Sequence, residues 1–302
     1  MSATIVTTVQ VKFDGSGVTD ISNRVISANI NYGRQRLLDE FGAGTATLTL
    51  RNDDNFITPG HSDSTQGNTQ LIGREVRISA AVTGGSSNPN DRSVATGSVT
   101  CLSASSQTHN ALDYLQDIAR TENGKILVNH AGTPSSSNFG GVLEFIAKDT
   151  VPLATGLTVS DANSLSSGNI QADDIKLEYG SELLFNSYSI TPASGSVQTG
   201  SNSTSIGKYG TRTLSRSVLS NTTDAAAAGT YYIGLYDEPT LRVSEVTLQA
   251  DMAVTADAEK ILHLNVNSSL DLSILPVGSS ATLTGEYVVE GLSIQILPKD
   301  VS

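Results

Sequence analysis

The sequence predicts a mainly β fold with one small α/β insert. Stretches in which apolar and polar residues alternate recur along the chain, a pattern typical of strands with one buried face. The composition agrees: 38% of the residues are hydrophobic and 16% charged, and Ser, Thr, Asn and Gly fill the gap. At 302 residues the chain is long enough for two or three domains, each with its own core.

The first 82 residues are predicted to form strands. Apolar residues alternate with polar ones over residues 26–32, and residues 45–50 repeat the pattern with threonine on the solvent face. Residues 34–41 fit either a short helical turn or an exposed loop. The expected strands cover residues 9–13, 26–32, 45–50 and 76–82.

A helix followed by a β-hairpin is predicted for residues 111–147. Apolar residues from Ala111 to Ala119 recur at helical spacing, so one face of this helix is expected to pack. Asn110 is a candidate N-cap, and Asn123-Gly124 supplies the left-handed residue that ends the helix. Strands 125–130 and 142–147 are expected to follow, joined by a loop rich in Gly, Ser and Pro.

The second half of the chain is predicted to contain a second sheet and one or two helices. The connection Gly84–Gln107 and residues 151–174 have the composition of linkers, the latter with one short strand. A helix over residues 224–236 is stopped by Pro239, and Gly229 weakens it by about 1 kcal/mol relative to alanine. The expected strands cover residues 175–179, 184–191, 241–248 and 287–296.

The formal net charge of −12 is unevenly distributed. Residues 1–155 carry 14 acids and 11 bases, net −3, whereas residues 156–302 carry 16 acids and 7 bases, net −9. Because phosphate binding needs stripes of Lys and Arg, we expect no specific nucleic-acid binding. An acidic surface that lines a conduit would instead let DNA slide past without being gripped.

Seven sequence motifs follow one another in a characteristic order along the chain. The first part contains GTATLTL at residues 44–50 and VRI at 76–78. The middle contains ALDYLQDIARTENG at 111–124 and LEFIAKD at 143–149. The last part contains SIGKYGTR at 205–212, PTLRV at 239–243 and VVEG at 288–291. In this order the motifs resemble the tail-tip or baseplate hub (minor tail) proteins of bacteriophages. The chain departs from the family at Gly84–Gln107, where the family usually has a longer stretch.

The resemblance implies a fold and a function. It implies two β-barrel-like tail-hub domains, residues 1–105 and 156–302, with the small α/β (helix plus hairpin) module, residues 106–155, between them. It also implies a homotrimer that presents a quasi-sixfold ring to the tail tube, with a tube ring above and a fibre or spike below. Such a hub closes the tube, carries adhesion proteins and lets DNA pass on infection. We therefore expect a virion tail protein made in the host cytoplasm, without stable membrane insertion and without catalysis.

Catalytic, cofactor-binding and metal-binding residues are not predicted anywhere in the chain. Cys101 lies in an alternating stretch where a small buried residue fits, and His109 is its only local candidate base. The run Asn52 to Asn55 lacks the spacing of a calcium loop and is predicted to be a polar turn. The histidines are too far apart in sequence to match a metal motif; they are His61, His109, His130 and His263.

Two other observations bear on partners. The arginines of the first part fit either a solvated face with ion pairs or an interface between subunits; they are Arg24, Arg34, Arg36, Arg51, Arg74 and Arg77. The absence of Trp and an aromatic content of 5% argue against a glycan groove built on aromatic platforms. An adhesin that contacts cell-surface glycans is nevertheless the alternative function, and a tail-associated glycan hydrolase is a third.

Overall fold

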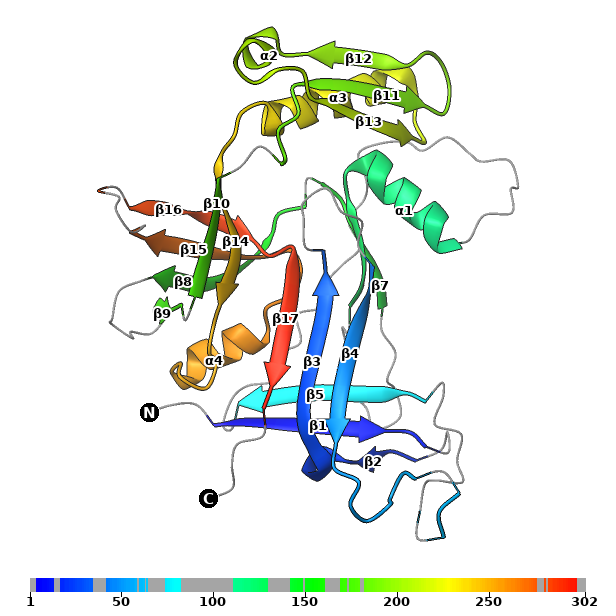
Figure 1. Ribbon diagram of the computed structural model, residues 1–302, viewed down its shortest axis with the longest axis vertical. Helices are drawn as coiled ribbons and strands as arrows, with labels where there is room; N and C mark the ends of the chain where they lie inside the picture. Colours follow the sequence, from blue (N-terminus) through cyan, green and yellow to red (C-terminus); the bar gives the residue numbers. More distant parts are fainter. Residues whose placement is uncertain are drawn as a thin grey trace.

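The computed structural model describes residues 4–13, 17–34, 42–58, 60–62, 64, 74–82, 111–129, 142–148, 150–160, 169–172, 174–179, 182–275, 280 and 282–297. These residues form the predicted mainly β fold, with four α-helices and six sheets of two to four strands (Figure 1). No closed barrel is found in this part of the chain, so the barrel-like domains are seen only as small sheets. Three predicted features lie outside the described residues: residues 35–41 of the expected helical turn or loop, the candidate N-cap Asn110 and the connection Gly84–Gln107.

The N-terminal sheet lies at the lower end of the molecule (Figure 1). Its order is β2 (Thr19–Asp20), β1 (Ile5–Val11) and β5 (Val76–Val82), all antiparallel, and the short 3-10 helix η1 (Ser22–Arg24) follows β2. The alternation seen in the sequence places Val9 and Val11 of β1 in a core that also receives Phe13 and Ile21.

A second three-stranded sheet joins the two ends of the chain. It has the order β17 (Gly291–Ile296), β3 (Val25–Gly33) and β4 (Gly42–Leu50), again antiparallel. The sequence predicted one closing strand over residues 287–296. In the structure β16 (Leu283–Val288) ends before Glu290, and the chain turns so that β17 pairs with β3 instead of extending the same sheet.

The C-terminal half builds its core between two sheets. One has the order β16, β15 (Ser268–Ile274), β8 (Leu153–Ser160) and β9 (Asn169–Gln171), and the other pairs β10 (Asp174–Tyr179) with β14 (Leu241–Thr247). Helix α4 (Thr255–Leu262), which was not predicted, packs beside β5 and β8. Residues 151–174, predicted to be a linker with one short strand, contain two strands, β8 and β9. The linker part of the prediction was wrong, because β8 is a central strand whose Leu157 and Val159 are fully buried. Thr155 and Gly156 before these two residues and Thr158 between them hide the strand in the sequence.

The predicted helix and hairpin are confirmed. Helix α1 (Ala111–Glu122) is followed by β6 (Lys125–Asn129) and β7 (Val142–Ile146), which pair antiparallel. The helix ends as expected, with Asn123 in the left-handed region at φ 56° and the Gly124 amide donating to the Ala119 carbonyl.

The remaining unit is an insertion between β10 and β14. Its sheet has the order β12 (Gln198–Ser201), β11 (Ser187–Pro192) and β13 (Thr213–Val218), with β11 and β13 parallel. Helix α2 (Ser203–Tyr209) precedes β13, and α3 (Thr222–Tyr236) packs on one sheet face, which confirms the helix predicted over residues 224–236. Gly229 is needed there, because a Cβ would come within 2.4 Å of the Tyr188 ring.

A core substitution tests the assignment of β8. Leu157→Ala should lower the free energy of unfolding by about 2–5 kcal/mol, because it removes a fully buried side chain. The matched control is Leu153→Ala in the same strand, where the side chain is 37% exposed and the change should stay near 0.5 kcal/mol. Urea unfolding followed by circular dichroism measures both; equal effects would mean that residues 153–160 behave as a surface segment.

Candidate assembly surface

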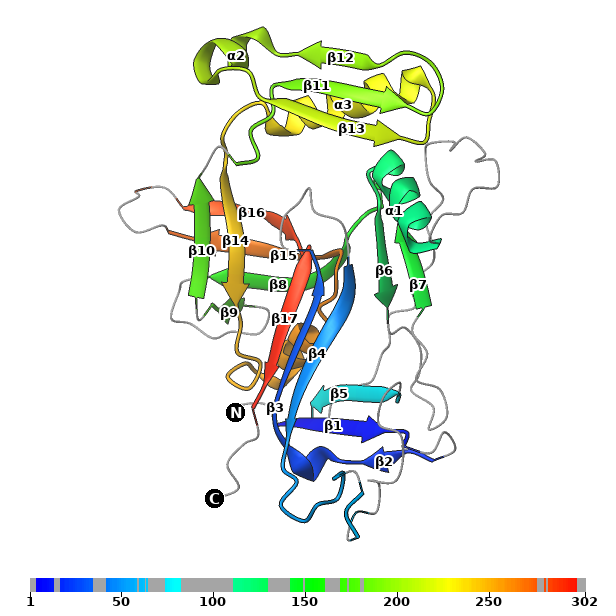
Figure 2. The same cartoon turned by 45° about the vertical axis from the view of Figure 1, so that its right-hand side comes forward.

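The sheet formed by β17, β3 and β4 has one apolar and one polar face. Tyr32, Leu48 and Leu292 on the apolar face pack into three different cores. The other face, which we call the amide–hydroxyl face, bears only exposed side chains that are polar and uncharged: Asn29, Asn31, Thr45, Thr47, Thr49, Ser293 and Gln295. Figure 2 shows β17 in front of β8 and β15, and Leu292 of β17 packs against the core that these two strands build, so the amide–hydroxyl face lies on the side away from that core.

Both outer strands of this sheet have an open edge. Within the described residues, β4 and β17 hydrogen-bond to no strand other than β3, although the start of β4 lies beside β6. Residues 44–47 are exposed on both faces of β4. Neither β4 nor β17 contains a charged residue or proline, the features with which proteins usually protect a strand edge from pairing with another chain.

The sheet depends on a close crossing of two glycines. Gly33 has φ 96°, and a Cβ there would lie 2.4 Å from the Gly291 Cα. A Cβ on Gly291 would lie 2.6 Å from the Arg34 carbonyl oxygen. Only glycine at both positions lets β17 approach the end of β3 this closely.

Glu290 fixes this crossing from the side. Its Oε2 accepts from Nε of Arg34 at 2.8 Å, and its Oε1 accepts from Nζ of Lys125 at 2.8 Å. The Arg34 amide also donates to the Glu290 carbonyl at 2.9 Å. The two cationic side chains are only 14% and 13% exposed. One carboxylate therefore joins the end of β3, the start of β6 and the turn before β17.

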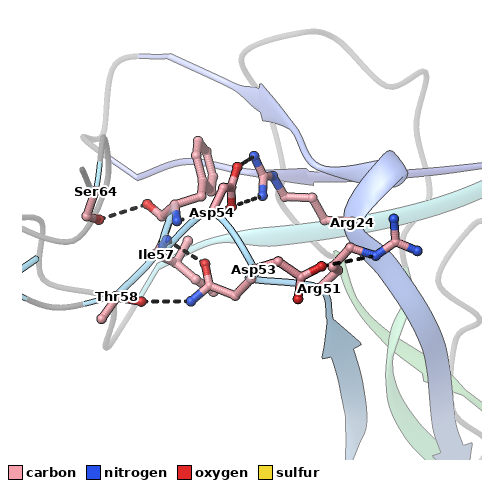
Figure 3. A network of polar contacts seen from close by, with 9 residues as sticks. Arg24, Arg51, Asp53, Asp54, Ile57, Thr58 and Ser64 are labelled. Atoms are coloured by element: carbon pink, nitrogen blue, oxygen red, sulfur yellow. Dashed lines mark hydrogen bonds and ion pairs between the residues drawn. The ribbon is translucent and has the colours of Figure 1, made fainter.

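The run Asn52 to Asn55 forms the predicted polar turn (Figure 3). Asp54 receives two hydrogen bonds of 2.7 Å from the Arg24 guanidinium, which hold the pKa of its carboxyl at about 2. The Asn52 side chain accepts from the Ile57 amide at 3.0 Å and donates to Thr58 Oγ1 at 2.9 Å. These groups are occupied by the turn itself, as expected for a structural turn.

Helix α3 carries three tyrosines with a cation against each ring. Burial raises the pKa of Tyr232 and raises that of Tyr236 to about 12. The distances from the cation to the ring centroid are 5.7 Å for Lys148 on Tyr231, 5.0 Å for Arg216 on Tyr232 and 5.1 Å for Arg242 on Tyr236.

Two hydrogen bonds also connect the inserted unit to the C-terminal end of α1. The Tyr232 hydroxyl donates to Asn123 Oδ1, and the Leu219 amide donates to Thr121 Oγ1 at 2.8 Å. Because β13, α3 and α1 come from distant parts of the sequence, these contacts were not predictable from local patterns.

The structure places several residues that the sequence singled out. Arg24 and Arg51 make ion pairs with Asp54 and Asp53 at the surface, which fits the first of the two alternatives for the arginine set, a solvated face with ion pairs. Arg34 instead pairs with Glu290 in the largely buried junction described above. His61 lies in the turn region and His263 follows α4. Cys101, His109, His130 and Arg36 lie outside the described residues.

Neither a metal-ligand cluster nor a membrane-spanning helix is found among the described residues. They contain no group of three or more His, Cys, Asp or Glu side chains placed to hold a metal ion. The helices described in the structure are all too short or too polar to cross a membrane.

Comparison with known proteins identifies the fold. No family model and no curated protein matches the sequence. Among solved structures, the chain is similar to the 43 kDa tail protein of prophage MuSo2 from Shewanella oneidensis, with a TM-score of 0.51 and 11% identity over 96% of this chain and 95% of that one. A tail protein from Neisseria meningitidis MC58 covers 97% of this chain and 92% of its own length, with 9% identity and a TM-score of 0.45. The similarity to the Shewanella protein shows that the chain has the fold of a phage tail protein over nearly its full length.

The role of Glu290 can be tested by removing its charge. Glu290→Gln should lower the free energy of unfolding by roughly 2 kcal/mol, because it removes the charged hydrogen-bond acceptor that Glu290 provides to the largely buried Arg34 and Lys125. The matched control is Glu245→Gln, whose partner Lys176 is exposed, and it should cost under about 1 kcal/mol. Urea unfolding at low and at high salt measures the stability loss of both variants. A Glu290→Gln variant as stable as the Glu245→Gln control would show that the Glu290 ion pairs do not stabilise this crossing.

Proposed function

We propose that this chain is a structural protein of a phage tail that forms the hub at the tail tip or baseplate. In this role, three copies form a ring that closes the tail tube, carries the adhesion apparatus and lets DNA pass on infection. The observation that supports it most directly is the shared fold with the Shewanella prophage tail protein over nearly the whole of both chains. The order of the hub-like motifs along the sequence supports the same role.

The open edges of β4 and β17 supply a way to join the copies. These two strands flank β3 and both run antiparallel to it, so they run parallel to each other. In a cyclic ring every copy has the same orientation, so β4 of one copy meets β17 of the next as a parallel pair. The contact is head-to-tail, leaves no open edge once the ring closes and continues the sheet from copy to copy.

The charge distribution suits this arrangement. Each copy carries a net charge of −12, so copies repel one another wherever acidic surfaces meet. The β4 and β17 edges and the amide–hydroxyl face are uncharged, so contact there costs little electrostatic energy. The acidic surfaces left exposed repel DNA, which suits a conduit that passes the duplex without binding it.

The division into segments 1–105, 106–155 and 156–302 remains part of this proposal. In this arrangement β17 belongs to the third segment by sequence and to the sheet of the first by pairing. The two outer segments are then one connected body in the hub, and the helix–hairpin segment is held against it through Lys125 and Glu290.

Introducing lysines on the edge of β4 tests whether copies assemble through this strand. The double variant Thr45→Lys and Thr47→Lys should remain folded and monomeric, because lysine on a strand edge prevents pairing with another strand. The unchanged chain should reach the mass of three copies and show a ring in negative-stain images. Native mass spectrometry over a range of concentrations measures both.

The matched control places the same two changes on another exposed outer strand. Ser215→Lys and Ser217→Lys on β13 should leave the assembly unchanged. A β4 variant that assembles as well as the control, or an unchanged chain that stays monomeric at every concentration, would contradict the proposal.

A further inference from the structure

The sheet of the inserted unit has a free face made only of hydroxyl side chains. Helix α3 covers the opposite face, where Tyr188, Ile190 and Leu214 are buried. Figures 1 and 2 both show α3 behind the three strands, so the free face is turned to the viewer. We call it the hydroxyl face; its residues are Ser187, Ser189, Thr191, Thr199, Ser201, Thr213, Ser215 and Ser217.

Strand pairing arranges these hydroxyls as a regular array. Ser201, Ser187 and Thr213 form one row across the sheet, and Thr199, Ser189 and Ser215 form the next. Neighbours within a row are about 4.8 Å apart and successive rows about 6.6 Å apart, the spacings of a β-sheet. Ser and Thr together make up about a quarter of the chain, so a face composed of them alone is not expected from composition.

These hydroxyls are available to a ligand. Within the described residues, none of the eight side chains hydrogen-bonds to another protein group. Hydroxyls elsewhere are used internally: Ser205 donates to the Asp237 carbonyl, and Thr155 donates to the Ser269 carbonyl at 2.7 Å. Short Ser and Thr side chains also lose little rotational freedom when they bind, so the array is largely preorganised.

The chemistry of the face excludes most classes of partner. It bears no charged residue, so it attracts neither phosphate polymers nor ions. It bears no aromatic, Met or Arg residue, the side chains that dominate the centres of protein interfaces, where Ser is depleted. What it offers is a flat set of groups that each donate and accept hydrogen bonds. A neutral polymer whose own surface consists of hydroxyls is the complement of such a face.

We propose that the hydroxyl face binds a neutral polysaccharide chain, each sugar hydroxyl exchanging hydrogen bonds with Ser and Thr along the rows. Because the contacts are uncharged, binding is insensitive to salt. It rests on hydrogen bonding and needs no aromatic platform, which is consistent with the low aromatic content of the chain. A single copy binds weakly, and any assembly that presents several copies to one polymer strengthens the attachment.

Co-sedimentation with chitin and with cellulose particles tests this proposal, at low salt and at 1 M NaCl. The unchanged chain should be retained by at least one of the two particles equally at both salt concentrations. The triple variant Thr199→Val, Thr213→Val and Ser215→Ala should lose at least tenfold in affinity, because each change removes a hydrogen-bonding group from the centre of the array.

The matched control is the triple variant Thr223→Val, Thr240→Val and Thr284→Val, three exposed threonines outside both named faces, which should bind within twofold of the unchanged chain. If the first triple variant does not fold, Ser215→Arg blocks the same face by its size and should give the same loss. The proposal is overturned if neither particle retains the unchanged chain, if salt abolishes retention, or if both triple variants bind equally. The mass of the assembly is measured in parallel, so a failure of ring formation is distinguished from a failure of glycan binding.

Discussion

The structure depends on the crossing at which β17 meets the end of β3. Two glycines bring the backbones together, and the Glu290 carboxylate holds Arg34 and Lys125 beside them. A half-buried carboxylate between two cations is favourable only when both partners are in place, so the junction is sensitive to geometry. Through it, a strand near the C-terminus completes the sheet of the N-terminal half, and the helix–hairpin segment is fixed to the same point. The outer edge that β17 presents exists only because this crossing forms.

The amide–hydroxyl face and the hydroxyl face are both uncharged, but they belong to different sheets and suit different functions. The amide–hydroxyl face belongs to a sheet with two open edges, which suits contact between copies. The hydroxyl face belongs to an inserted unit that is connected to the body through β10, β14 and the end of α1. Side chains of the inserted unit bind α1 and cations from the body, so the unit is held in a defined position. An attachment surface on it would therefore be presented at a fixed distance from the assembly sheet.

The sequence predicted the elements that local physics determines. The helix of α1 follows from its apolar spacing, and its end follows from Asn123, which adopts the left-handed conformation expected there. The helix of α3 was predicted despite Gly229. The structure explains this glycine, because a Cβ at position 229 would clash with the ring of Tyr188. The polar turn at Asp54 was predicted from its composition, although its partner Arg24 was not, because that residue lies 30 positions away.

Features that depend on tertiary contact were missed. Strand β8 resembles a linker because its small and polar residues conceal two core side chains, Leu157 and Val159, that are buried only when β15 lies alongside. The segment around Glu290 was recognised as part of a strand, but local alternation does not tell which sheet receives β17. The same limit applies to the candidate site: Glu290 lies 256 positions from Arg34, and no sequence spacing connects them.

The most direct test of this account is a disulfide between the two open edges. Thr47 and Gln295 both pair with Asn29, so they lie on opposite sides of β3, about 9.6 Å apart and beyond disulfide reach within one copy. In a Cys101→Ser background, the double variant Thr47→Cys and Gln295→Cys should form covalent oligomers of up to three copies on oxidation. Either single variant should not form a covalent trimer. A double variant that stays monomeric under oxidation at high concentration would contradict the account.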